Sequence, residues 1–265
     1  GNVAVGRLSL RDNTTGHSNT AVGYQTLRDN TNNQNTAVGS GALSLNTSGS
    51  QNTAVGNAAL VNNTTGVNLT AVGSNSALNN TTGNNNTAVG MQSLKMNTTG
   101  GSNTAVGLNS VLFNTSGSNN TGTGTSALQS NTTGSDNTAC GAQALLDNTT
   151  GGSNTAVGHE ALANNISASL NTAVGVDSLK LNTTGGSNTA VGTYSLQANT
   201  TAQFNVAVGV DSLGNNTTGN SNTAIGYEAM ETNTTGYSNV AVGYESLTSN
   251  TTGHRNVAVG IEALR

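Results

Sequence analysis

Acidic side chains are the first residues of this chain whose type and spacing could perform chemistry. Glu228, Glu245 and Glu262 each lie two residues after a glycine that closes an Ala-Val-Gly or Ala-Ile-Gly triplet, so they recur every 17 residues. Two neighbouring carboxylates can act as the acid and base of a glycosidase, or as ligands of a weakly bound cation. A solvated surface row explains the same spacing more simply, because surface charges commonly serve solubility alone. We therefore predict that the chain is not an enzyme.

Histidine and cysteine are too sparse to build a metal site or an activated nucleophile. His17, His159 and His254 fall in different parts of the chain, and no cysteine or group of carboxylates gathers around any of them. The single Cys140 takes the place of a Val that recurs throughout the sequence, which predicts a small buried core residue. The Gly-rich Asp repeats that bind calcium in other β-rolls are absent. The sequence thus predicts no catalytic residue, no metal and no cofactor.

Composition excludes several classes of protein. Of the 265 residues only 33% are hydrophobic, 3% are aromatic and 7% are charged, and there is no proline. One ordinary globular core cannot be assembled from so few apolar side chains, yet disordered chains are typically rich in charge and proline. The net charge of -4 gives no reason to expect nucleic acid or an anionic membrane as a partner. No apolar run approaches the length of a membrane span.

A fixed repeat positions every residue named above. The glycine that closes the triplet, the anchor glycine, occurs sixteen times, and fourteen of the fifteen intervals are 17 residues long. The exception is the 16-residue step from Gly23 to Gly39, which predicts a local bulge near Asn32. Such a unit is too short for a pair of helices, and its β-branched and turn-forming residues favour strands. We predict an all-β parallel β-solenoid or β-roll, one 17-residue coil per repeat and about 16 coils, forming a single array over 1–265.

The three residues before the anchor glycine predict the strand of each coil. The first is Thr or Val in all sixteen copies, and it shares a strand face with the Val that directly precedes the anchor. We predict that this face points into the coil, together with the Leu found four residues after the anchor in thirteen copies. The opposite face then carries Ala and Gly. Such small residues indicate either a crowded bend within the coil or, as we favour, a flat seam against other copies.

Asparagine marks the turns with the same regularity. An Asn lies seven residues after the anchor in every coil that can hold one, and a second Asn lies four residues before the anchor in fifteen of sixteen coils. Stacked coils bring equivalent amides together, which predicts hydrogen-bonded ladders. The triplets Asn-Thr-Thr and Asn-Thr-Ser match the glycosylation signal, but glycans about 4.8 Å apart would collide. We interpret these as turn and ladder residues, with representative positions Asn13, Asn46, Asn97, Asn148, Asn199 and Asn250.

Two stretches carry a resemblance to known families. The run from Asn239 to Gly243, Asn-Val-Ala-Val-Gly, resembles the head repeats of trimeric autotransporter adhesins of the YadA type. The run from Asn222 to Met230 is similar to repeats in phage-type tail-fibre proteins. The resemblance implies a homotrimer or end-to-end fibre, located outside the cell or on a virion, with a host-surface or glycan receptor as partner. Because the chain begins and ends in mid-pattern, we expect a fragment of a longer fibre.

Function is therefore predicted at the level of a structural and adhesive fibre segment. Tyrosine offers contact area with a polar tip, so we predict a contact patch formed by Tyr227, Tyr237, Tyr244 and His254. The alternative is an ice-binding solenoid, because such folds can present regular Thr arrays. Val replaces Thr at the first strand position in four copies, which weighs against a uniform array. A carbohydrate-active β-helix ranks third, because clustered acids are missing.

Overall fold

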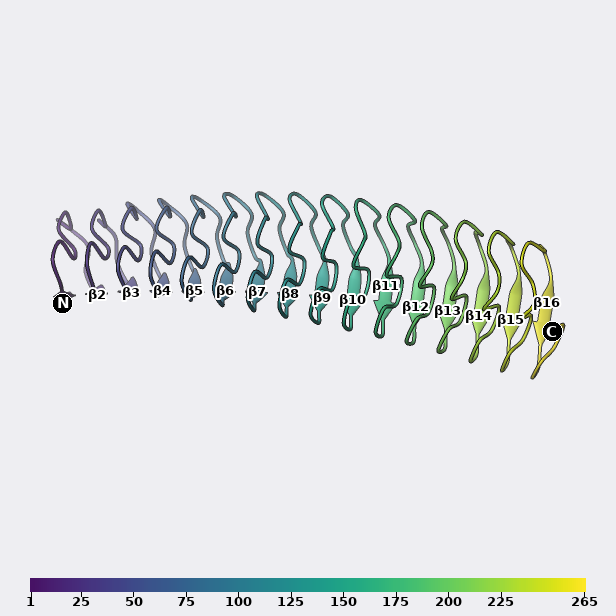
Figure 1. Cartoon of the computed structure of the whole chain (residues 1–265). Coiled ribbons are helices and arrows are strands. Elements are labelled where there is room, and N and C mark those ends of the chain that lie inside the picture. Colours follow the sequence, from purple (N-terminus) through teal and green to yellow (C-terminus); the bar gives the residue numbers. More distant parts are fainter. The chain divides into compact units, whose positions relative to one another are not determined.

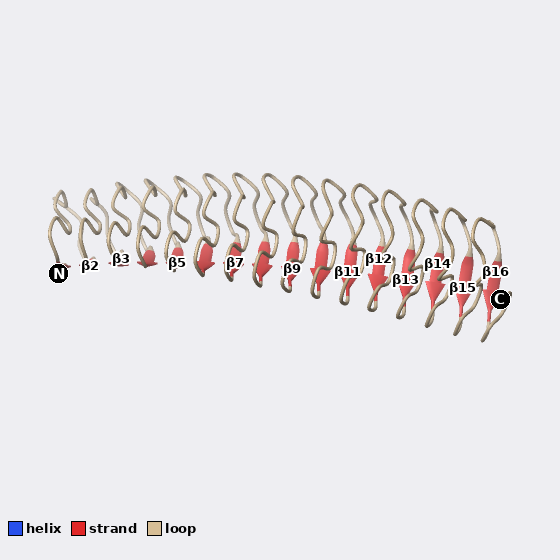
Figure 2. Cartoon of the chain, viewed as in Figure 1, coloured by secondary structure: helices blue, strands red, loops and turns tan.

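The fold is an all-β parallel solenoid, as the repeat predicts. The computed structural model describes residues 1–265, with sixteen three-residue strands and no helix. Figure 1 labels the strands, and Figure 2 shows them joined by turns alone. The chain divides into two compact units, unit 1 from Gly1 to Ser135 and unit 2 from Asp136 to Arg265. No segment forms a helix long and apolar enough to span a membrane.

Each unit contains eight strands. Those of unit 1 are β1 (Val3–Val5), β2 (Thr20–Val22), β3 (Thr36–Val38), β4 (Thr53–Val55), β5 (Thr70–Val72), β6 (Thr87–Val89), β7 (Thr104–Val106) and β8 (Thr121–Thr123). Those of unit 2 are β9 (Thr138–Cys140), β10 (Thr155–Val157), β11 (Thr172–Val174), β12 (Thr189–Val191), β13 (Val206–Val208), β14 (Thr223–Ile225), β15 (Val240–Val242) and β16 (Val257–Val259).

Within each unit, consecutive strands pair in parallel and in step. Thr53 pairs with Thr70, and Thr189 pairs with Val206, each one repeat further along the chain. The short step from Gly23 to Gly39 does not disturb this register, because Thr20 still pairs with Thr36. The missing residue is taken out of the preceding turn. Equivalent side chains therefore form straight rows, spaced about 4.8 Å apart along each unit.

The prediction of which strand face points inward was wrong. The central Ala of the strand is buried, as Ala71, Ala105 and Ala207 show, whereas the Thr and Val beside it are partly exposed. The coil is too narrow for the larger pair. At Gly122, which replaces this Ala, an added Cβ would lie 2.6 Å from the Cγ2 of Val111. The interior therefore accepts the smallest side chain of the strand, and the β-branched pair faces solvent.

The favoured seam of Ala and Gly against other copies is also wrong. Ala fills the interior of its own coil, and the anchor glycine forms a crowded corner between successive coils. Gly90 has φ +130°, and a Cβ added there would lie 2.5 Å from the carbonyl oxygen of Gly107. Both the positive φ and the close backbone approach require glycine. Crowding within the chain, not contact with a partner, accounts for these small residues.

The turn after the anchor buries the Leu row in an uncommon backbone conformation. Leu94 is fully buried with φ 52°, and Gln92, two residues earlier, has φ 58°. Positive φ is uncommon for such residues, so neighbouring structure must hold them in place. Neighbouring coils do so, because the Leu94 amide donates to Ser110 at 2.9 Å and the Gln92 amide donates to Ser74 at 3.0 Å. Inter-coil hydrogen bonds thus continue beyond the strand into the turn.

Asparagine ladders run through the interior of each unit. The Asn97 side-chain amide donates to the Oδ1 of Asn80 at 2.8 Å and to the carbonyl of Gly100 at 2.9 Å. Asn46, Asn199 and Asn250 make the same pair of bonds, and Asn148 accepts a bond from Asn165. Both side-chain amide hydrogens of Asn46, Asn97, Asn199 and Asn250 are engaged, so these nitrogens are not free to carry a glycan in the folded chain.

One rung of this ladder is missing in the short coil. Asn13 donates to Gly16 at 2.9 Å, while Asn30 donates to the carbonyl of Asn32 at 2.7 Å and does not reach Asn13. The second Asn row remains bonded there, because the Asn35 amide N–H donates to the Oδ1 of Asn19 at 2.9 Å. The one-residue deletion therefore costs a single side-chain rung and leaves the strand register intact.

Candidate functional site

The outward strand residues form a regular surface in unit 1, here called the Thr/Val face. Its residues are Thr20, Thr36, Thr53, Thr70, Thr87, Thr104 and Thr121 in one row, and Val22, Val38, Val55, Val72, Val89, Val106 and Thr123 in the other. Val38, Val55 and Val72 are each 37% exposed, so successive coils present the same surface to solvent. The face is therefore an ordered array of hydroxyl and methyl groups.

Unit 2 presents a more apolar version, here called the unit 2 strand face. It consists of the outward residues of β9 to β16 and the residue that follows each anchor glycine. Its most apolar part lies at β13 to β16, where Ile225 is 41% exposed and Val210 is 42% exposed. The side chains there are Val206, Val208, Val210, Thr223, Ile225, Tyr227, Val240, Val242, Tyr244, Val257, Val259 and Ile261.

The four residues of the predicted contact patch form two separate stacks. The rings of Tyr227 and Tyr244 stack with centroids 5.2 Å apart, and those of Tyr237 and His254 stack at 4.7 Å. The first pair follows the carboxyl ends of β14 and β15. The second pair precedes the amino ends of β15 and β16, so the two stacks lie at opposite edges of the unit 2 strand face.

Carboxylates line the edge that carries the tyrosine pair. A hydrogen bond with Glu228, together with its charge, raises the pKa of Tyr227 to about 12. Glu245 raises the pKa of Tyr244 in the same way. Burial raises the pKa of Asp211, and the charge of Glu228 adds to that shift. This edge is acidic overall, although Arg265 pairs with Glu245 and Glu262, whereas the opposite edge holds His254 and the exposed Arg255.

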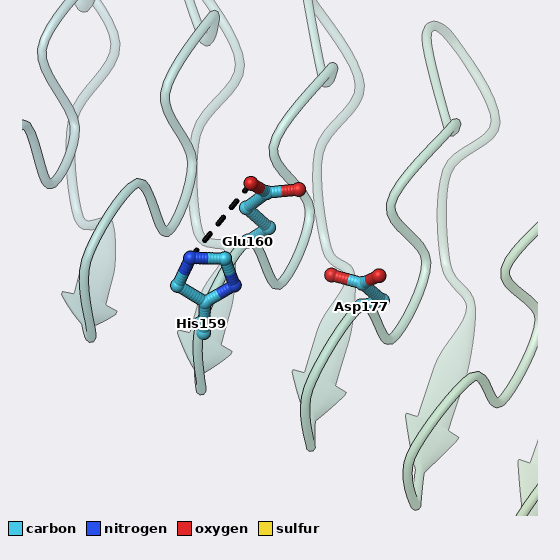
Figure 3. Close-up of side chains that lie close together, drawn as sticks. All are labelled: His159, Glu160 and Asp177. Carbon is cyan, nitrogen blue, oxygen red and sulfur yellow. Dashed lines mark ion pairs between the residues drawn. The ribbon is translucent and has the colours of Figure 1, made fainter.

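A cluster of possible metal ligands lies elsewhere in unit 2. Ligand atoms of His159, Glu160 and Asp177 all lie within 4.8 Å of one another, and Figure 3 shows Asp177 approaching from the neighbouring coil. The positively charged side chain of Lys180 already lies among these groups, because its Nζ forms a salt bridge with Glu160 and lies 3.2 Å from Asp177. The hydrogen bond from Lys180 lowers the pKa of Glu160. The arrangement is a paired ion network, and it offers no vacant set of ligands.

Cys140 is another residue whose predicted burial was wrong. Predicted as a buried core residue, it is exposed, because it belongs to the outward Val row at the end of β9. The reversed assignment of the inward strand face also meant that neither the Thr/Val face nor the unit 2 strand face was predicted to be exposed. The invariant small Ala was the available signal, since a narrow coil admits only the smallest side chain. No pocket or cleft accompanies these surfaces.

Comparison with known proteins assigns no family. The chain matches no protein family model, and no curated protein matches it. Its function must therefore be inferred from the two strand faces and their edges.

Proposed function

We propose that this chain is a segment of a structural and adhesive fibre, exposed on a cell surface or a virion, that associates laterally with further copies. The exposed unit 2 strand face carries this proposal. Isolated apolar residues are normal on a protein surface, but a contiguous apolar patch commonly marks an interaction site. Three copies that turn this face towards a common axis cover one another's apolar surface, and a homotrimer is the expected product.

The size of this face supports self-association. Eight strands about 4.8 Å apart, each presenting about five residues at 3.3 Å, cover roughly 600 Å². Covering that area on all three copies of a trimer removes roughly 1,800 Å² from solvent in the whole assembly, and specific, stable protein interfaces begin at about 1,200 Å². The β-branched side chains also lose little rotamer freedom on contact. The face is therefore large and rigid enough for a specific interface.

Charge favours copies with parallel axes. Glu245 is already paired with Arg265, so the charge of the acidic edge that is available to a partner lies near Asp211 and Glu228. Rotation about the coil axis brings this part of the edge towards the His254 and Arg255 edge of the next copy. Rotation about an axis across the coils would bring acidic edges together. Complementary edges steer association and fix its register, whereas like charges disfavour it. A parallel, cyclic assembly follows from this distribution.

Light scattering after size exclusion tests the proposal. The wild-type chain of 26.2 kDa is expected at about three times its monomer mass. Val242→Lys places a charge in the middle of the face and is expected to give a folded monomer. Ser249→Lys, in the same coil but away from the face, is the matched control and should retain the wild-type mass. A monomeric wild type, or an unaffected Val242→Lys variant, would contradict the proposal.

A further inference from the structure

The strand threonines of unit 1 have free hydroxyl groups. None of the seven Thr residues in the first row of the Thr/Val face donates a side-chain hydrogen bond within the protein. The Thr row in the turn behaves differently, since the hydroxyl of Thr64 donates to Thr81 at 3.0 Å and that of Thr81 donates to Thr98 at 3.0 Å. One threonine row therefore stabilises the coil, while the other directs its hydroxyls to water.

This free row is rigid and evenly spaced. Paired strands fix the backbone in step from Thr20 to Thr121, and Thr side chains have restricted rotamers in strands. The repeat along the row is about 4.8 Å, set by strand spacing alone. The adjoining Val row has constant exposure over β3 to β5, so its methyl groups are equally accessible to solvent there. Such an array holds its hydroxyl and methyl groups in place before any ligand arrives.

The surroundings of this face are almost free of charge. Between Asn30 and Ser135 the only charged residue is Lys95. Solvent-facing sheets ordinarily carry polar and charged side chains, which keep their strands soluble and hydrated. Here, apolar methyl groups restrict the orientation of adjacent water while hydroxyls anchor it by hydrogen bonds. The face therefore has the chemistry needed to order water along its rows.

We propose that the Thr/Val face of unit 1 binds ice. The ligand is the surface of the crystal, which the water held by the hydroxyl row joins as part of its lattice. Val in the second row fills the spaces between hydroxyls with methyl groups and adds no charge. The inference is independent of the fibre proposal, because the latter rests on the unit 2 strand face. The four Val substitutions at the Thr position also fall mostly in unit 2, and only Val3 lies in unit 1.

Thermal hysteresis and ice partitioning of the full chain test this inference. Freezing below the melting point, with shaped crystals and enrichment of the protein in slowly growing ice, is the expected result. Thr70→Tyr places a bulky ring in the centre of the face and should abolish most of the hysteresis. Thr70→Val, a residue that other coils accept at this position, should reduce it by a smaller amount.

A matched control separates the face from general effects. Asn79→Phe introduces a ring at a turn position where other coils hold Met96 and Phe113, so it should keep wild-type hysteresis. Circular dichroism establishes that each variant remains folded. Equal freezing and melting temperatures for the wild type would overturn the proposal, as would full hysteresis in a folded Thr70→Tyr variant. The Val242→Lys variant should retain hysteresis, which distinguishes this inference from the fibre proposal.

Discussion

Replacing Asn97 with alanine removes one rung from the interior ladder of unit 1. The Asn97 amide donates to Asn80 and Gly100, and its Oδ1 accepts a bond from Asn114 at 2.8 Å. The side chain is fully buried. The substitution therefore removes three hydrogen bonds at once and leaves a buried amide hydrogen of Asn114 without its acceptor.

The expected loss in free energy of unfolding follows from these contacts. Three hydrogen bonds at about 1 kcal/mol each reduce the free energy of unfolding by about 3 kcal/mol, and the stranded donor adds about 1 to 2 kcal/mol. Gly100 remains satisfied because Asn86 also donates to it at 2.8 Å. We expect a total loss of about 4 to 5 kcal/mol, large for a single substitution. Asn57→Ala changes an exposed Asn and should cost less than about 0.5 kcal/mol.

Urea denaturation followed by far-UV circular dichroism measures this difference. Because coils interact mainly with their neighbours, hydrogen exchange should also quicken in the coils on either side of residue 97. An Asn97→Ala variant as stable as Asn57→Ala, with unchanged exchange, would refute the view that the amide ladder stabilises the interior.

Three further predictions concern the corner, the acidic edge and the ion network. Gly90→Ala should prevent the coil from closing, because its Cβ would meet the carbonyl of the next coil, and a wild-type thermal midpoint would contradict that geometry. Burial and neighbouring carboxylates raise the folded-state pKa of Asp211 and Glu231, so ionisation of these two groups lowers the stability of the fold at neutral pH. This loss of stability disappears as the pH falls through the folded-state pKa towards the unfolded-state pKa. The double variant Asp211→Asn, Glu231→Gln should therefore melt higher than wild type at about pH 7 and gain less on acidification to about pH 4, whereas equal melting at neutral pH would count against the cause assigned. Millimolar zinc should leave the melting of the wild type unchanged, because Lys180 already neutralises the nearby carboxylates, and it should stabilise Lys180→Met; zinc stabilisation of the wild type would show that the lysine does not block the ligands.

The repeat made the fold and the ladders predictable from the sequence. A constant period places identical residues above one another, so Asn97 could be assigned to a ladder without knowing the path of the turn. The same period located the coil boundary at each anchor glycine. Periodicity fixes which residues become neighbours, because each coil pairs in register with the coil before it.

The orientation of the strand was not predictable from polarity. Val is more apolar than Ala, so hydrophobicity placed Val242 inside and Ala241 outside, the reverse of the structure. The narrow cross-section of the coil determines which strand face points inward, and this cross-section depends on how the turn folds back onto the strand. Positive φ at residues such as Leu94 sets that path, and no sequence rule assigns such a conformation to Leu. The strand faces followed only once the turn was known.

The central claim is that another copy of the chain covers the unit 2 strand face in solution. Hydroxyl-radical footprinting with mass spectrometry tests it on the wild-type protein over a range of concentrations. Tyr244 and Phe113 are each 46% exposed in the single chain, but Phe113 lies on a turn away from the strand. We predict that oxidation of Tyr244 falls as the protein concentration rises, while that of Phe113 stays constant. Oxidation of Tyr244 that is independent of concentration, in a sample shown to be monomeric throughout, would contradict the claim.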